Sequence, residues 1–125
     1  MAKIYRHRAG QLDEHVGRID SQSGHVYSER FGPDRYIGQV NYEEGKVYAH
    51  RVGPDRYLGR VDADDGRIYA HRLGPDEYVA RIEKDGKLYR HVPLGMDIYL
   101  GRIEDMAHPV EGAAALFFFF TEEST

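Results

Sequence analysis

The sequence predicts an all-β protein, an antiparallel meander of five β-hairpin repeats with about ten short strands. Three observations lead to this prediction. A pattern of about 21 residues recurs five times, and each copy contains two runs rich in Val, Ile and Tyr. Turn-forming residues separate these runs at intervals of roughly eight to twelve positions, which is typical of all-β domains.

The five repeats occupy residues 3–24, 25–45, 46–66, 67–86 and 87–108. We expect residues 1–108 to form one domain and residues 109–125 to form an apolar C-terminal tail. The pattern is clearest in 46–66, where two strand-like runs flank a Gly-Pro-Asp sequence. The first and last copies deviate from it, as terminal repeats that cap an array usually do.

Turn residues predict two kinds of connection. Within the repeats, Pro54 is suited to the first central position of a tight turn, and the Asp55 side chain can bond its own backbone. Between repeats, the loops 22–24, 43–45 and 64–66 end in glycine and fit three-residue hairpin loops with a left-handed glycine. Asp85 and Gly86 fit a two-residue turn.

The alternation of side chains along a strand assigns the faces of the sheet once a register is chosen. We place Val52 opposite Tyr57. This register predicts an inner face that contains Tyr48, His50, Val52, Tyr57, Gly59 and Val61. It predicts an outer face that contains Val47, Ala49, Arg51, Leu58, Arg60 and Asp62.

An apolar face across ten strands must be covered. Closure into a barrel, with the strand around Ile4 paired with the strand around Ile103, would bury this face and remove both sheet edges. The alternative is an open, twisted sheet that pairs in a dimer or wraps on a partner. We favour the closed barrel.

The tail contains the apolar run 112–120, which ends in four consecutive phenylalanines. Exposed to water, this run would promote aggregation. We therefore expect it to dock on its own domain, at a barrel mouth or an open edge. Self-association and insertion into a protein partner are the alternatives. At nine residues the run is too short for a transmembrane helix, which needs roughly 20.

Composition excludes several classes of function. The net charge of −4, with basic and acidic residues interspersed, argues against nucleic-acid binding. The chain has no cysteine, so it has no disulfide, thiolate nucleophile or Cys-ligated metal. Its N-terminal residues lack the features of a secretory signal, so we expect a soluble protein with a cytoplasmic location by default.

Histidines recur at one position of the repeat, as His50, His71 and His91. Equivalent residues of successive hairpins lie roughly 10 Å apart, whereas metal ligands lie about 2.0–2.2 Å from the ion. We therefore expect these histidines to bond tyrosines such as Tyr48 and Tyr69 in a packed interior, with ligand or proton sensing as the alternative and no metal.

Arg60 and Arg81 recur in the same way and could bind an anion, but an acidic residue follows each by two positions on the same face, so a solvated face is favoured. The Gly-Pro-Asp aspartates are better explained by turn formation than by calcium binding. No nucleotide-binding loop, nucleophile elbow or zinc-protease motif is present. We therefore expect neither a cofactor nor catalysis.

Three segments, at 36–40, 57–61 and 99–103, read Tyr-x-Gly-x-Val or Tyr-x-Gly-x-Ile. They resemble the start of MORN repeats, which are also hairpin repeats of slightly greater length. The resemblance covers most of residues 3–104, although this chain lacks the second Gly-x-Gly pair of that family and adds Gly-Pro-Asp. It implies a non-catalytic scaffold that assembles proteins or contacts lipid.

The sequence thus predicts a non-catalytic binding or assembly module. The alternative is a small-molecule-binding β-barrel whose interior is lined by His and Tyr. The candidate contact residues are His50, His71, His91, Tyr48, Tyr69, Arg60, Arg81, Phe117, Phe118, Phe119 and Phe120.

Overall fold

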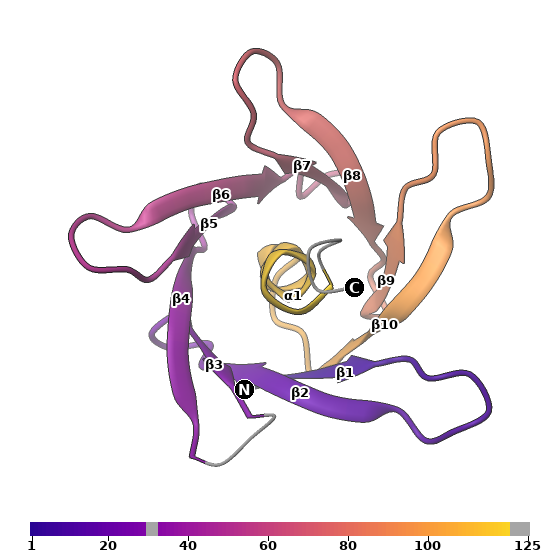
Figure 1. The fold of residues 1–125 in the computed structure, drawn as a ribbon, viewed down its shortest axis with the longest axis horizontal. Helices are drawn as coiled ribbons and strands as arrows, with labels where there is room; N and C mark the ends of the chain where they lie inside the picture. The colour runs from indigo at the N-terminus through magenta and orange to yellow at the C-terminus, as the bar shows by residue number, and fades with distance from the viewer. Residues whose placement is uncertain (30–32, 121–125) are drawn as a thin grey trace.

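The computed structural model describes residues 1–29 and 33–120. The chain forms ten antiparallel strands that close into a barrel around one helix (Figure 1). The strands are β1 (Ala2–Arg6), β2 (Glu14–Ile19), β3 (His25–Ser28), β4 (Arg35–Asn41), β5 (Lys46–Ala49), β6 (Arg56–Val61), β7 (Arg67–Ala70), β8 (Glu77–Ile82), β9 (Lys87–Arg90) and β10 (Ile98–Glu104). The helix is α1 (Val110–Phe119). The predicted antiparallel meander is therefore confirmed.

The barrel closes between the first and last strands. β1 pairs with β10, and Ile4 lies opposite Ile103. Every other strand pairs with its neighbours in the chain, so the order around the barrel follows the sequence. Of the two arrangements that the sequence left open, the closed one is correct, and it leaves no free sheet edge.

A β-bulge occurs in every repeat, and it makes the predicted faces wrong. In the third repeat Val47 lies opposite Gly59 but Tyr48 lies opposite Tyr57, so Leu58 is the extra residue. The bulge turns Leu58 and Gly59 toward the lumen and Tyr57 outward. The corresponding shifts in the other repeats fall at Val16, Ile37, Val79 and Leu100.

The loops between repeats add a second change of register. Gly24, Gly45, Gly66 and Gly86 have positive φ angles, as predicted. However, the amide of Asp62 donates to the Arg67 carbonyl, which makes this loop one residue longer than expected. Val61 therefore lies opposite Ile68 instead of Tyr69. A one-residue shift moves a whole strand's side chains to the other face.

As a result, aliphatic residues line the lumen and tyrosines lie outside. The aliphatic residues of the first strand of each repeat are completely buried: Ile4, Val26, Val47, Ile68 and Leu88. The expected inward positions of Tyr48, His50, Val52 and Tyr57 are wrong, as are the expected outward positions of Val47, Ala49 and Leu58. Val52 lies at a hairpin tip and is fully exposed.

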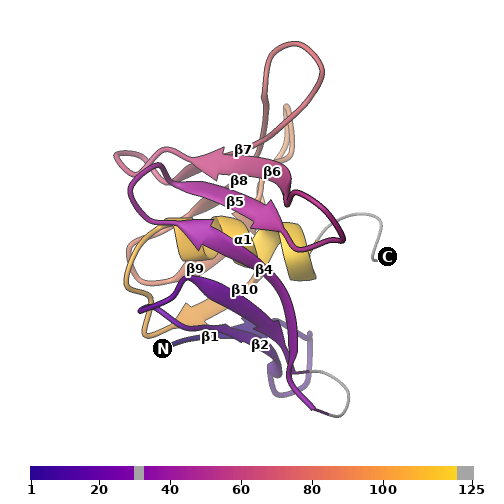
Figure 2. The ribbon, with the colours of Figure 1, turned by 90° about the vertical axis from the view of Figure 1, so that its left-hand side faces the viewer.

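Helix α1 fills the lumen (Figure 2). The apolar tail thus docks on its own domain, inside the barrel rather than at a mouth or an edge. Strand glycines make room for its aromatic rings, because a side chain at the glycine would overlap the ring. Phe119 packs on Gly17, Phe118 on Gly38 and Phe117 on Gly59.

Both ends of α1 are anchored by polar contacts. Glu111 is completely buried near the N-terminus of the helix. Its carboxylate accepts hydrogen bonds from Tyr42 Oη (2.6 Å), Ser21 Oγ (3.1 Å) and the amide of Ala107 (2.7 Å). At the other end, Arg6 and Arg90 donate to the carbonyls of Phe119 and Phe120, which no helical N–H satisfies.

Candidate binding surface

The two ends of the barrel differ. The hairpin loops within the first, third, fourth and fifth repeats point toward the end at which α1 terminates, and the connections between repeats lie at the other end (Figure 2). We call the first of these the hairpin-tip end. It combines exposed apolar loop residues, a groove beside α1, and a belt of ionic contacts that links the repeats.

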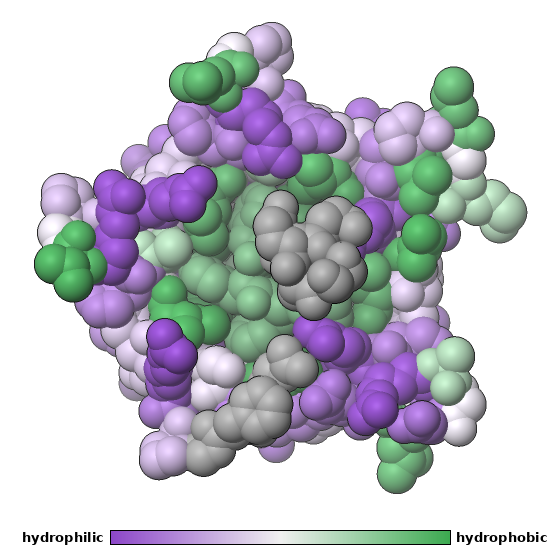
Figure 3. Space-filling model, viewed as in Figure 1, coloured by the Kyte–Doolittle hydropathy of each residue, from purple (hydrophilic) through white to green (hydrophobic). Residues whose placement is uncertain are grey.

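Apolar side chains stand exposed at the hairpin tips. Among residues 1–29 and 33–120 the exposed large hydrophobic residues include Leu12, Val52, Leu73, Leu94 and Met96, all at tips. Their exposed fractions run from 90% to 109%, so they make no packing contribution to the barrel. Figure 3 shows this end, with apolar patches on the protruding hairpins and an apolar centre, separated by polar side chains.

A groove with a volume of about 660 Å³ opens between the hairpins of the third, fourth and fifth repeats. Its floor is apolar and includes side chains of β6, β7, β8 and α1. Its walls carry arginine, histidine and tyrosine. The lining residues are Arg56, Tyr57, Leu58, Ala70, His71, Arg72, Glu77, Tyr78, Val79, Arg90, His91, Pro93, Leu116 and Phe117.

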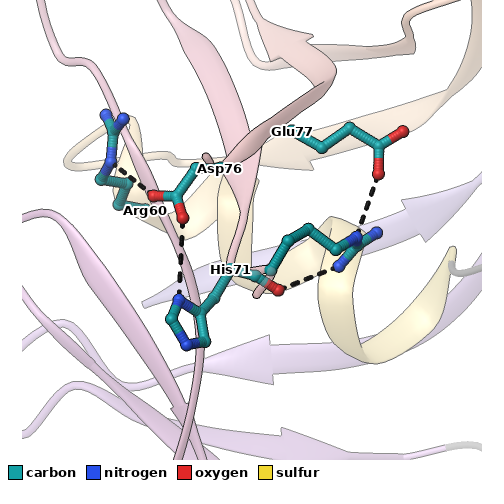
Figure 4. Close-up of polar contacts among 5 residues, drawn as sticks. Arg60, His71, Asp76 and Glu77 are labelled. Atoms are coloured by element: carbon teal, nitrogen blue, oxygen red, sulfur yellow. Dashed lines mark hydrogen bonds and ion pairs between the residues drawn. The ribbon is translucent and has the colours of Figure 1, made fainter. Parts of the chain in front are cut away.

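A belt of side-chain contacts links successive repeats on the outside of the barrel. Arg60 Nε donates to Asp76 Oδ2 (3.2 Å), and His71 Nδ1 lies 3.6 Å from Asp76 Oδ1 (Figure 4). Each such aspartate belongs to the tip loop of one repeat and binds a side chain of the preceding repeat. The links are Arg18–Asp34, Gln39–Asp55, Arg60–Asp76, Arg81–Asp97 and Arg102–Asp13. The last joins the fifth repeat to the first and completes the ring.

Tyrosines pack into the same belt. The Arg60 guanidinium lies over Tyr69, 4.4 Å from the ring centroid, and the ring of His71 packs against Tyr57 at 4.9 Å. Burial and then the charge of Asp76 raise the pKa of Tyr57. The belt therefore packs the Arg60 guanidinium against Tyr69 and the His71 ring against Tyr57.

The structure assigns most predicted contact residues to this belt. His50, His71 and His91 lie outside the barrel, with side-chain exposed fractions of 52%, 53% and 29%, so the expected packed His and Tyr interior is wrong. Their contacts are with aspartates and tyrosine rings of the belt. Tyr48 and Tyr69 pack against Tyr57 and Tyr78.

Arg60 and Arg81 are each held by a carboxylate of the next repeat. The tip aspartates thus bind the neighbouring repeat, and only Asp97 also accepts a bond from an amide of its own loop, that of Val92, among the described contacts. Of the four consecutive phenylalanines, Phe119 and Phe120 are buried. Phe117 alone lines the groove.

Sequence reasoning missed Glu111 and the tip residues. Glu111 lies next to an apolar run and carries no repeat signal. The tip residues did carry one, because Val52 and Leu73 both precede Gly-Pro-Asp. An aliphatic residue at a turn apex has no strand neighbours to pack on, so this position could have been identified as exposed.

Within residues 1–29 and 33–120 no three His, Asp or Glu side chains are grouped so that they could hold a metal ion. In the same part of the chain, no helix has the length and apolar character needed to cross a bilayer. Comparison with known proteins finds no match among family models, curated proteins or solved structures.

Proposed function

We propose that this protein is a non-catalytic binding module that docks onto a partner protein through its hairpin-tip end. The observation that carries the proposal is the set of exposed apolar tip residues in the first, third, fourth and fifth repeats. Apolar side chains that are exposed to solvent on several protruding loops at one end of a fold indicate a contact surface.

Proline restricts the backbone of two of the tip loops, which suits them to a protein partner. Gly53 and Gly74 have φ angles of +88° and +86°, and the proline that follows each has a restricted φ. Arg51 and Arg72 lie beside the tip residues Val52 and Leu73. Aromatic residues, arginine and apolar anchors on a pre-ordered surface are what protein interfaces use, because little entropy is lost on binding.

The charge of the tip loops favours a protein partner over an anionic membrane surface. Every described tip loop ends in a carboxylate, at Asp13, Asp55, Asp76 or Asp97. Membrane-binding loops carry an excess of Lys and Arg, because anionic lipids repel carboxylates. The resemblance to MORN repeats also implies an assembly role, and that resemblance stays a prediction.

The test compares three forms of the full chain. The first is the wild type, and the second carries serine in place of all five tip residues, Leu12, Val52, Leu73, Leu94 and Met96. The third carries Ala63→Ser, an exposed alanine in a loop at the opposite end of the barrel. Each form is immobilised, and the proteins that it retains from a lysate are quantified. A retained protein is then purified and titrated against all three forms.

We expect a purified partner to bind the wild type and the Ala63→Ser form equally, and the serine-tip form at least tenfold more weakly, since hot-spot side chains contribute about 2 kcal/mol or more each. Equal binding to all three forms would contradict the proposal. So would tip-dependent binding to phosphatidylserine vesicles without any protein partner, which would assign the tips to a membrane.

A further inference from the structure

The groove at the hairpin-tip end has an apolar floor. Leu58 and Val79 are bulge residues that face the lumen, and Ala70 lies between their strands. Leu116 and Phe117 of α1 complete the floor. Leu116 and Ala70 are almost completely buried, with exposed fractions of 3% and 4%. The floor therefore consists of packed residues at the mouth of the barrel, where α1 meets the sheet.

The walls of the groove are cationic. Arg56, Arg72 and Arg90 line it with one carboxylate, that of Glu77. Glu77 is bound by Arg72, whose Nε donates to Oε1 at 3.0 Å. Arg90 donates to the carbonyl of Phe120. Two guanidinium groups thus have partners within the fold, and the groove keeps an excess of positive charge.

Arg56 is different from the other two arginines. It makes no hydrogen bond, ion pair or ring contact with any residue in the described part of the chain. It begins β6 and stands exposed beside the apolar floor. A guanidinium group offers paired donors that match a carboxylate or a phosphate group.

We propose that this groove binds an anionic amphiphile, a molecule with one carboxylate or phosphate group and an unbranched alkyl chain. The head group binds Arg56, with His71 and His91 beside it. The chain lies on Leu58, Val79 and Phe117. The ligand needs both its head group and its alkyl chain. An anion without a chain would leave the apolar floor exposed to water, and a hydrocarbon without a head group would leave the Arg56 guanidinium without a partner.

The size of the groove agrees with this ligand class. Its volume of about 660 Å³ lies within the roughly 300–1,000 Å³ that is usual for small-molecule sites. Apolar floors with a few placed polar groups are also usual in such sites, since the floor provides affinity and the polar groups fix orientation.

The experiment titrates the full chain at pH 7 with octanoate, octyl phosphate, acetate and 1-octanol, each below its micelle-forming concentration. Calorimetry measures affinity, and ¹H–¹⁵N chemical shifts locate the site. The key variant is Arg56→Gln. Arg35→Gln is the matched control, because Arg35 occupies the same position of the second repeat and does not line the groove.

We expect octanoate or octyl phosphate to bind with shifts at Leu58, Val79 and Phe117, and acetate and 1-octanol to bind at least tenfold more weakly. Arg56→Gln should weaken binding about tenfold, the usual effect of losing one charge-assisted bond, and Arg35→Gln should leave it unchanged. Tighter binding of octyl phosphate than of octanoate would identify a phosphate head group, and the reverse a carboxylate.

Three results would overturn the proposal. One is the absence of saturable binding by either amphiphile. The second is equal binding by acetate, which would reduce the site to a simple anion contact. The third is equal loss in Arg56→Gln and Arg35→Gln, which would place the ligand elsewhere. The tip residues are unchanged in all these forms, so failure here is distinguishable from failure of the proposed protein docking.

Discussion

The ring of Phe118 fills the space that a side chain at position 38 would occupy. A Cβ atom on Gly38 would overlap the Phe118 ring as well as the carbonyl oxygen of Tyr48. The same relationship joins Phe117 to Gly59 and Phe119 to Gly17, so three consecutive helix residues meet three successive repeats. Ala80 stands at the equivalent position of the fourth repeat and is completely buried.

Gly38→Ala should therefore destabilise the protein by about 1–3 kcal/mol, because overpacking a filled core forces side chains and backbone apart. Chemical denaturation measures this change. Ala80→Gly is the control at the equivalent position, and it should destabilise less, by about 1 kcal/mol, through lost packing and added chain entropy. Equal stability of Gly38→Ala and the wild type would show that Phe118 does not lie on Gly38.

Glu111→Gln should lower the free energy of unfolding by about 1–3 kcal/mol, the usual cost of leaving a buried polar group unsatisfied. An amide has only one oxygen, so it cannot accept from Tyr42, Ser21 and the Ala107 amide together. Tyr42→Phe should cost less. In the double variant the losses should be less than additive, because the two residues share one bond.

The pH dependence of stability should include a contribution from Asp97. Burial alone would raise the pKa of Asp97, but hydrogen bonds from the Val92 amide and Arg81 outweigh it and lower the pKa below its ordinary value. The ionised carboxylate therefore stabilises the fold above its unfolded-state pKa of about 3.9. This contribution is lost as the pH falls through the lower pKa of the folded state.

Asp97→Asn should thus lose stability at pH 7, by on the order of 1 kcal/mol or less since the pair is partly exposed. Its stability should also fall less steeply below about pH 4. Denaturant unfolding at a series of pH values measures both effects. Arg81→Gln should change stability in the same direction, and a wild-type acid profile for Asp97→Asn would exclude this role.

Removal of α1 should abolish cooperative folding. A chain that ends at His108 would leave an apolar lumen lined by residues such as Ile4 and Val47, and a hollow interior of this kind loses its dispersion contacts. We expect aggregation or dye binding typical of exposed apolar surface, measured by light scattering and fluorescence. The full chain should be a monomer when free of a partner, because its Phe run is inside. A folded, monomeric truncated chain would contradict this.

The sequence was sufficient to predict the repeat period, the meander, the left-handed loop glycines and the pairing of Ile4 with Ile103. Each of these depends on local turn chemistry or on the need to bury one face and protect sheet edges. The faces could not be predicted in the same way. Alternation gives the face of a strand only if no residue is inserted, and a bulge at Leu58 inserts one in the middle of an apolar run.

A different comparison would have found the correct face. The position of Val47 is aliphatic in all five copies, whereas the next position is tyrosine, which tolerates water at its hydroxyl. A strictly aliphatic position is the better candidate for the lumen. The groove at Arg56 could not be predicted, because it forms where three repeats and α1 pack together. No local sequence pattern determines how these distant segments pack.

The order of the elements along the chain has a consequence for how the protein is made. β1 has only β2 to pair with until residues 98–104 are available, and the lumen stays unfilled until residues 110–119 are available. Contacts of this sequence separation form slowly. During synthesis the hairpins therefore emerge before the last strand and α1 can cover their apolar side chains, so closure of the barrel and filling of its lumen come last.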